Sequence, residues 1–496
     1  MLAVLAAVYL PWTWSGQLAS LGGDSAVYVL AAQQYAPYLP ADPVVDSVAS
    51  NSQFPPLYPL LLAATGGAVD LRLAHLATTV CLLGAFASLY AWLIATGLPR
   101  GPAAATVAVF AALPGTQVQA LYLLSENLCL WLTLAALALL AGASSEPRRW
   151  WIATALVAAA LLTRSAAVAL LPALAIALLA RRPRGWLLML PAAVAPAAVW
   201  AVLRHPEHDY RAGLLEHYAG LAPADALTRI GEGALEAARG LAANLIPSTP
   251  GVGMTALGAC VALAVAARAF RGAPDALYAL AYAAMISIWP YPSEDVRFAW
   301  SILPVLLGLS VHAAWRVFAR VPARNPRLRA ALPWAGVAIP ALLAAPAVAL
   351  TAGRNLDPWA SEHPGVRQLP EYYALNADDA RARAALHLEL VQAIRELGAE
   401  VPAGECIISI KPVVVALLAH RDGFVPPFEN APDGVFDAWL PALPCHAFLL
   451  MAATSPDYAR PYYPRDRLGD RFEVLDMRVS QRDASGRVVA ALARLR

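Results

Sequence analysis

Eleven apolar runs fill most of residues 1–352, and they constrain this chain more than any other feature. A helix that crosses the roughly 30 Å hydrocarbon core of a bilayer needs about 20 apolar residues, and several runs reach that length. Only 14% of the 496 residues are charged, whereas a soluble globular chain carries about 25%. We therefore predict an α-helical polytopic membrane protein. The predicted spans are 2–14, 72–97, 103–124, 127–143, 151–163, 165–180, 186–203, 251–270, 274–291, 297–318 and 330–351.

Arginine residues in the short loops predict the orientation of these helices. Loops rich in arginine or lysine stay on the cytoplasmic side of a membrane. Placing five arginine loops there puts the N-terminus in the cytoplasm and everything after about residue 351 on the external side. The five loops contain Arg100; Arg148 and Arg149; Arg181, Arg182 and Arg184; Arg268 and Arg271; and Arg316, Arg320, Arg324, Arg327 and Arg329.

Two loops on the same side of the membrane must be separated by an even number of crossings. This parity argument decides two ambiguous segments. The run Leu57–Val69 is too short to span comfortably, and counting it as a crossing would move Arg100 outside, so we predict a half-inserted or interfacial helix. Arg148 and Arg181 must share a side. This requires a hairpin of two short helices that turns at 163–165, in place of one long tilted helix.

The composition changes to mixed charge at Gly353. We predict a membrane domain over 1–352, with external loops at 15–71 and 204–250, and an external soluble α/β domain over 353–496. Hydrophobic periodicity predicts the elements of the second domain. They are a helix Asp378–Leu397 ending at Gly398, a strand Cys406–Ile410, a helix Val413–Ala419, a strand Ala447–Met451 and an alternating segment Phe472–Val479.

Two features of the predicted external domain have alternative interpretations. Cys406 and Cys445 each begin a strand, and an external compartment permits a disulfide between them. Two buried thiols are an equally good interpretation, because spacing alone does not set connectivity. Lys411 is the only lysine of the chain, which either codon bias in a GC-rich genome or chemistry explains.

Asp24 is the first candidate for chemistry. It follows Gly22 and Gly23 and opens a helical stretch that includes Tyr28 and ends near Tyr35. One interpretation is a helix cap, the ordinary role of an aspartate at a helix start. The other interpretation follows from position, because the segment comes directly after a membrane helix and has an apolar side. Such a helix lies in the interface, where a carboxylate can accept a proton from an incoming hydroxyl.

Glu126 and Arg164 are isolated charges within apolar sequence. An ionisable residue buried at the end of a membrane helix is costly and indicates function, whereas a turn carboxylate facing water is an equally good interpretation of Glu126. Arg164 is flanked by LLT and SAAVALL, so it requires an acidic partner or a phosphate, and its planar fork suits either. The simpler alternative is an arginine that extends from a short turn to water.

A second charged turn lies on the predicted external face, before the run 297–318. It contains Glu294, Asp295 and Arg297. In the simpler interpretation the acidic pair caps the following helix or pairs with Arg297. In the functional interpretation all three residues bind substrate beside the other charged candidates, which the predicted topology places on the same face.

The sequence contains no recognisable nucleotide or metal motif. No GxGxxG, Walker A or HExxH string occurs in a suitable context. The net charge of +2 is spread without a basic patch, so we expect no nucleic-acid partner. We expect neither a metal nor an organic cofactor.

The order of the motifs resembles that of the GT-C glycosyltransferases, in particular bacterial dolichyl-phosphate-mannose-protein mannosyltransferases and aminoarabinose-transferase-like proteins. The resemblance covers about residues 1–320 and implies the GT-C fold. Six motifs carry it, and all of them are predicted to face the external side. They are a short first helix, GGDSxxY, FPPLYPLLL, SEN opening an apolar helix, LLTRSAAVALLP and a late EDVRF.

The resemblance implies an enzyme of the bacterial cytoplasmic membrane that moves a sugar from a polyprenyl-phosphate carrier to a lipid, glycan or protein acceptor outside. Asp24 matches the first-loop aspartate that acts as general base in an inverting displacement. Arg164 and Arg297 match positions that hold the carrier phosphate, and Glu126 would orient the acceptor or support an arginine. Many members have a second acidic residue after that aspartate. Here it is Ser25, which argues against a bound metal.

Two other classes of protein compete with the enzyme. A transporter or flippase would favour internal repeats, broken helices and charges near the midplane, and the sequence shows no evident repeat. A non-catalytic envelope-assembly protein is the third possibility, because of Ser25. A cavity open sideways to lipid near Asp24 would favour the enzyme, and a continuous pore would favour transport.

Overall fold

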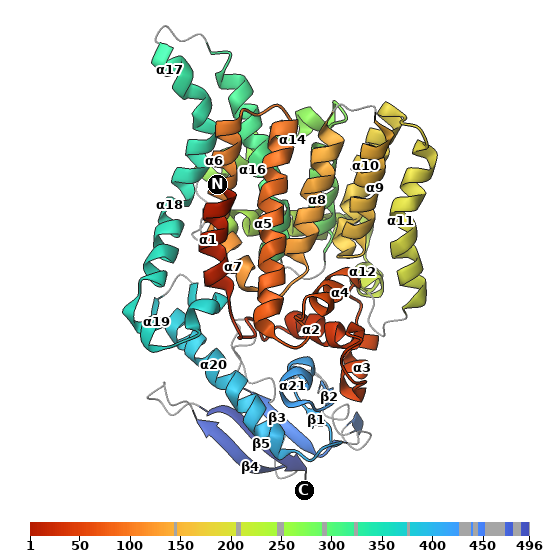
Figure 1. Ribbon diagram of the computed structural model, residues 1–496, viewed down its shortest axis with the longest axis vertical. Helices are drawn as coiled ribbons and strands as arrows, with labels where there is room; N and C mark the ends of the chain where they lie inside the picture. The colour runs from red at the N-terminus through yellow and green to blue at the C-terminus, as the bar shows by residue number, and fades with distance from the viewer. Residues whose placement is uncertain are drawn as a thin grey trace.

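The computed structural model describes residues 1–142, 146–204, 210–245, 252–289, 295–321, 326–373, 377–425, 438–439, 445–451, 472–479 and 488–495. These residues form a helical bundle with a smaller α/β unit at one end (Figure 1). The N-terminus lies in the bundle and the C-terminus lies in the α/β unit.

A helix occurs in each interval that the apolar runs predict. Large side chains such as Phe86, Trp92, Phe110 and Trp300 fill the space between these helices. The bundle comprises α1 (Leu2–Thr13), α5 (Leu71–Ala95), α6 (Arg100–Ala112), α7 (Pro114–Leu121), α8 (Glu126–Ala141), α9 (Pro147–Leu161), the 3-10 turn η1 (Ser165–Ala169), α10 (Leu170–Arg181), α11 (Trp186–Leu203), α14 (Val252–Ala269), α15 (Pro274–Ser287), α16 (Asp295–Phe318), α17 (Pro326–Ala331), η3 (Leu332–Trp334) and α18 (Ala335–Asn355).

The chain is a polytopic membrane protein, but the predicted count of eleven spans is not confirmed. Within the described residues, four helices are long and apolar enough to cross a membrane: Leu71–Ala95, Trp186–Leu203, Val296–Phe318 and Leu332–Asn355. The pair α6 and α7 makes a fifth if this 61° bend is counted as one span. Other helices are shorter than the roughly 20 residues of a full crossing, as α8 with 16 and α9 with 15 residues show.

The C-terminal ends of α5, α10 and α16 lie at the end of the bundle opposite to the α/β unit (Figure 1). Each of these helix ends is next to one of the five arginine clusters on which the predicted orientation rests. Their common position agrees with the parity argument, which required the arginine loops to share a side.

Three short helices of the first loop lie between the bundle and the α/β unit (Figure 1): α2 (Asp24–Tyr35), α3 (Pro43–Ser50) and α4 (Leu57–Ala64). With eight residues, α4 is the short helix that the parity argument required in place of a span. Arg204, at the end of α11, holds the C-terminal end of α3. Its Nη1 donates to the carbonyl oxygens of Ala49 at 2.5 Å and Ser50 at 2.9 Å, in the last turn of that helix.

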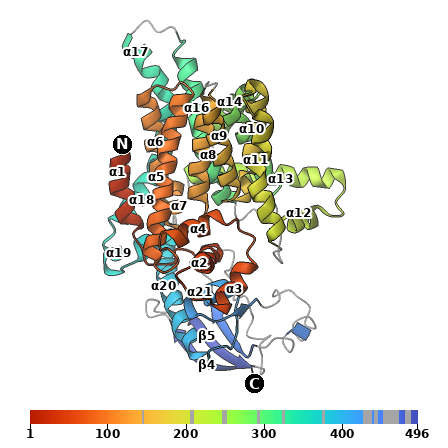
Figure 2. The ribbon, with the colours of Figure 1, turned by 45° about the vertical axis from the view of Figure 1, so that its right-hand side comes forward.

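The predicted loop 204–250 is largely helical in its described part. The helices α12 (Tyr210–Tyr218) and α13 (Pro223–Leu245) extend to one side of the bundle (Figure 2). The C-terminal end of α13 is held against α16, because Nδ2 of Asn244 donates to the carbonyl oxygen of Val296 at 2.7 Å.

The α/β unit contains a five-stranded sheet in the order β2-β1-β3-β5-β4. Its first three strands pair in parallel and its last three pair antiparallel. The strands at Ala447–Met451 and Phe472–Val479 have the predicted bounds. The unit and its connection to the bundle comprise α19 (Pro358–Glu362), η4 (Val366–Gln368), η5 (Pro370–Tyr373), α20 (Ala377–Glu400), β1 (Ile407–Ile408), α21 (Pro412–Ala419), β2 (Gly423–Phe424), β3 (Ala447–Met451), β4 (Phe472–Val479) and β5 (Val488–Leu495).

The prediction that Gly398 ends the long amphipathic helix is wrong. Helix α20 continues to Glu400. A Cβ atom at position 398 would collide with the side chain of Ala419 in α21, so glycine is required for the close approach of two helices and not for a helix end.

Cys406 and Cys445 form a disulfide between the start of β1 and the start of β3. Their Cα atoms are 4.9 Å apart, across two neighbouring parallel strands. This pairing decides between the two interpretations that the sequence leaves open.

The α/β unit is joined to the first loop by a shared core and by a buried histidine. His387 of α20 is fully buried, with Nε2 2.8 Å from the carbonyl oxygen of Leu18 and Nδ1 3.3 Å from Oε1 of Glu371. Burial has the largest single effect on the pKa of His387 and lowers it, but the carboxylate of Glu371 and the carbonyl of Leu18 together raise it above its usual value of 6.5.

This histidine predicts how the stability of the docked unit depends on pH. Because the pKa is raised in the folded state, the contribution of His387 is complete below its unfolded pKa of about 6.5 and is lost as the pH rises through the folded value. The thermal unfolding midpoint of the detergent-solubilised protein should therefore fall from pH 6 to pH 9. In His387→Gln this part of the pH dependence should disappear, and an unchanged slope in that variant would contradict the assignment.

Candidate active site

Asp24 is the first residue of α2, directly after Gly23. Gly23 has φ +108°, a conformation that favours glycine, and it turns the chain so that the helix begins at the edge of the bundle. The cap residue of α2 is Gly23, so the interpretation of Asp24 as the helix cap is wrong. Oδ2 of Asp24 instead accepts a hydrogen bond from Nη1 of Arg297 at 2.7 Å.

Arg297 links two carboxylates. It lies in the first turn of α16, and besides Asp24 it contacts Glu126, with Nε 3.1 Å from Oε1. Glu126 is the first residue of α8, and its side chain is fully buried. The alternative that Glu126 is a turn carboxylate facing water is therefore wrong.

Arg164 completes a chain of four charges. Its Nη1 lies 2.8 Å from Oε1 of Glu126, so the alternative of an arginine extending to water is wrong. The predicted turn at 163–165 is present between α9 and η1 and is held by a hydrogen bond from the backbone N–H of Leu57 to the carbonyl of Leu162 at 2.9 Å. The ion-pair order is therefore Asp24–Arg297–Glu126–Arg164, although 273 residues separate Asp24 from Arg297.

One aromatic ring supports both guanidinium groups. The ring of Phe298 lies 5.0 Å from Cζ of Arg164 and 5.1 Å from Cζ of Arg297. Cation–π attraction to one ring keeps two like charges in the same place, in addition to their shared carboxylate. Neither sequence periodicity nor a charge pattern singled out Phe298.

Tyr28 packs against the start of α8, directly before Glu126 of this chain of charges. It is buried, and its hydroxyl shares a 2.7 Å hydrogen bond with the hydroxyl of Ser125, the residue before Glu126. Its ring stacks on Phe54 with centroids 4.7 Å apart and meets Tyr58 edge-on at 5.0 Å. Tyr28 thereby fixes α2 against the start of α8 and against the FPPLY segment.

Two candidates from the second charged turn fall on the part of the chain whose side chains the structure does not describe. Glu294 lies outside the described residues, and Asp295 is described only as the first residue of α16, without its side chain. In the described part of the chain, no group of three or more His, Cys, Asp or Glu side chains could hold a metal ion.

The exposure of the four side chains differs in a way that separates their roles. The side chain of Asp24 is 36% exposed and that of Arg297 is 22% exposed, whereas that of Arg164 is 14% exposed and that of Glu126 is 0% exposed. Asp24 is thus the carboxylate that an entering hydroxyl can reach. Glu126 is shielded, and its charge holds the two arginines together. The Nε of Arg164 is buried and makes no hydrogen bond to any described residue.

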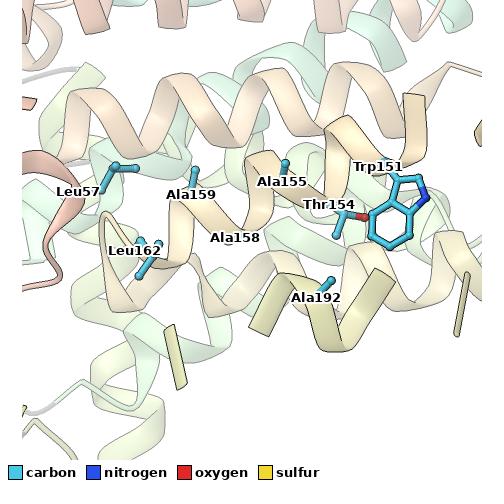
Figure 3. A pocket seen from close by; sticks show the side chains of 8 residues that line it. All are labelled: Leu57, Trp151, Thr154, Ala155, Ala158, Ala159, Leu162 and Ala192. Carbon is cyan, nitrogen blue, oxygen red and sulfur yellow. The ribbon is translucent and has the colours of Figure 1, made fainter. Parts of the chain in front are cut away.

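An apolar groove of about 360 Å³ lies along α9, the helix that precedes Arg164 (Figure 3). It is formed by α9, by Ala192 of α11 and by Leu57 at the start of α4. Trp151 lies at one end, and Leu57 and Leu162 lie at the other (Figure 3). Trp151 is exposed, so the groove opens on the outer surface of the bundle. Leu162, which lines the end opposite to Trp151, precedes Arg164 by two residues.

Comparison with sequences identifies no relative, because neither a protein-family model nor a curated protein matches the chain. Comparison with solved structures does find similar folds. ArnT from Cupriavidus metallidurans bound to undecaprenyl phosphate matches with a TM-score of 0.52 and 16% identity, over 99% of this chain and 96% of that chain. Its apo state matches with a TM-score of 0.50 and 14% identity, over 99% and 97% of the two chains.

An oligosaccharyltransferase from Archaeoglobus fulgidus, tethered with an acceptor peptide, gives a TM-score of 0.49 at 14% identity, over 90% of this chain and 68% of that chain. The two matches to ArnT cover nearly all of both chains, which includes the bundle and the α/β unit. At this level of identity they establish the architecture, and the chain therefore has the GT-C fold.

Proposed function

We propose that this chain is a membrane glycosyltransferase, which moves a sugar from a polyprenyl-phosphate carrier to an acceptor hydroxyl on the external face. The observation that carries this proposal is the ion-pair chain Asp24–Arg297–Glu126–Arg164, in which Arg164 follows Leu162 of an apolar surface groove by two residues. A partly exposed carboxylate, two arginines and an apolar groove correspond to the three parts of the reaction: an acceptor proton, a leaving phosphate and a lipid chain.

The groove and the arginines support a lipid-linked donor. The groove is lined almost entirely by alanine, leucine and tryptophan, which suits an isoprenoid chain. A chain lying in it would end near Arg164, whose guanidinium favours a phosphate. The GT-C fold supports the same donor class, since the ArnT structure that matches contains undecaprenyl phosphate.

The proposed reaction is a single inverting displacement. The acceptor oxygen attacks the anomeric carbon while its proton passes to the free oxygen of Asp24. The bond from the anomeric carbon to the phosphate oxygen breaks, and the electron pair leaves with the polyprenyl phosphate. Arg164 and Arg297 stabilise the negative charge that develops on this phosphate, and Glu126 keeps both arginines in place. The residues present require no metal for this step.

The disulfide supports an external position for the α/β unit. Disulfides persist in oxidising compartments and are rare in the cytoplasm. The bond Cys406–Cys445 lies in the same unit that covers the site, at the end of the bundle opposite to the arginine loops. Both arguments favour an orientation in which the site faces the periplasmic side of a bacterial inner membrane.

Filling the groove tests the lipid-linked donor. Ala159→Trp is expected to weaken the binding of undecaprenyl phosphate about tenfold, the effect of losing ~1.4 kcal/mol of contact with the chain. Inorganic phosphate, which has no chain to lie in the groove, should bind the variant and the unaltered protein alike. The measurement is ligand binding to the purified protein in detergent.

The matched control is Ala195→Trp, an exposed position of α11 outside the groove, which should leave both affinities unchanged. Equal weakening of both ligands by Ala159→Trp would overturn the role of the groove. Movement of lipid-linked sugar across a vesicle membrane without transfer to an acceptor would favour a flippase instead.

A further inference from the structure

The turn that carries Asp24 is built into the core of the α/β unit. Leu18, Leu21 and Ala26 of the first loop belong to the same buried cluster as Val414 and Val415 of α21. Figures 1 and 2 both place α21 beside α2 and α3. The α/β unit therefore forms one side of the candidate site.

Two residues at the start of α21 contact the two glycines before Asp24. Nζ of Lys411 donates to the carbonyl oxygen of Gly22 at 3.3 Å. A Cβ atom at Gly23 would lie 3.2 Å from Cγ2 of Val413, so the backbone of the turn lies directly against this valine. Gly23 has φ +108°, a conformation open to glycine, and this turn is held from the side of the α/β unit.

Asp24 is thus held from two directions. From the bundle, Arg297 binds its carboxylate at 2.7 Å. From the α/β unit, Lys411 binds the backbone two residues earlier. An ammonium group on four rotatable bonds can hold a carbonyl and still place its charge close to a neighbouring carboxylate. Lys411 is also the only lysine of the chain, so no second lysine can supply this ammonium group.

We propose that Lys411 is a positioning residue for the transfer reaction, by which the α/β unit sets the orientation of Asp24. This inference rests on the proposed function for Asp24. It predicts that the loss of the Lys411 amine lowers turnover without weakening the binding of the lipid donor, because the phosphate contacts lie on α16 and on the turn before η1.

A single lysine allows a direct test that does not depend on activity. Reductive methylation with ¹³C-formaldehyde keeps the charge of the amine and places an NMR probe on Lys411 in the full-length protein in detergent. The signal that Lys411→Met removes is that of Lys411. We expect this signal to shift in Asp24→Asn, which changes a neighbouring charge, and to stay unchanged in Arg494→Met. Arg494 is exposed and pairs with Glu405, which precedes β1, whereas Lys411 follows that strand.

Kinetics supply the second readout, with lipid-linked sugars extracted from cells that produce the protein as donors. Lys411→Met is expected to lower kcat between about 10- and 100-fold, the range that misplaced catalytic groups produce, with KM for the donor changed less than about twofold. Lys411→Arg should restore most of this loss, and Arg494→Met should behave as the unaltered protein.

The outcomes separate this inference from the proposed function. A signal that is identical in Asp24→Asn and the unaltered protein, or full turnover of Lys411→Met, would overturn the role of Lys411. An inactive unaltered protein in which the Lys411 signal still responds to Asp24→Asn would overturn the transferase and leave the contact in place. A Lys411→Met variant that loses its unfolding transition is replaced by Lys411→Gln for the kinetics.

Discussion

Asp24→Asn is expected to lower sugar transfer by roughly 10²–10⁴-fold, the contribution of a positioned general base. Asparagine has nearly the same shape, and its side-chain oxygen can still accept the hydrogen bond that Arg297 donates at 2.7 Å. It cannot accept the proton of the acceptor hydroxyl. The loss should therefore fall on kcat, while the affinity for undecaprenyl phosphate changes little, because the phosphate contacts of Arg164 remain.

The measurement is transfer of sugar from extracted lipid-linked donors by purified protein, with undecaprenyl phosphate binding measured in parallel. The matched control is the next residue, Ser25→Ala. The hydroxyl of Ser25 is buried and has no hydrogen-bond partner among the described residues, so this variant should keep full activity. Equal activity of Asp24→Asn and Ser25→Ala would exclude Asp24 as the base.

Glu126→Ala is expected to have the largest effect on stability. The glutamate is fully buried and is the common partner of Arg164 at 2.8 Å and Arg297 at 3.1 Å. Its removal leaves two guanidinium groups close together without their shared counter-charge. Breaking a buried ion pair by removing one partner costs roughly 3–5 kcal/mol, and transfer activity should be lost with it.

The comparison variant is Glu396→Ala in α20, whose carboxylate forms an exposed ion pair with Arg478 at 3.0 Å. Exposed pairs contribute little, so its unfolding midpoint in detergent should match that of the unaltered protein. The double variant Glu126→Gln with Arg164→Met removes one charge of each sign and should recover part of the lost stability without recovering activity. A Glu126→Ala protein that unfolds like Glu396→Ala would show that the buried carboxylate does not hold the arginines.

Each member of the charge cluster could be singled out from the sequence, but the contacts between them could not. Glu126 and Arg164 stood out because a charge inside an apolar run is costly, and Arg297 stood out at the mouth of a predicted helix. Arginine parity placed them on one face. The parity argument predicts the side of the membrane and no distance between residues. The order Asp24–Arg297–Glu126–Arg164 and the shared ring of Phe298 therefore appear only in the structure.

The errors and omissions of the sequence-based predictions have local causes. The helices occur at the predicted positions, but the count of eleven spans is not confirmed, because α8 has 16 residues and α9 has 15. Gly398 looked like a helix end because glycine is common there, and only the packing of α21 shows the other reason for it. Lys411 had no signal beyond being the only lysine, because a contact across 389 residues leaves no trace in local pattern.

The sequence by itself determined that this is a helical membrane protein with an α/β unit after the last apolar run, and it determined which isolated charges require partners. These conclusions depend on periodicity and on the cost of moving a charge out of water, and both are properties of short segments. The tertiary structure decided that Glu126 is shared by two arginines, that Cys406 pairs with Cys445, and that Lys411 of the α/β unit contacts the backbone carbonyl of Gly22, two residues before Asp24. These pairings follow from the packing of helices distant in the chain, which brings together residues that no local pattern relates.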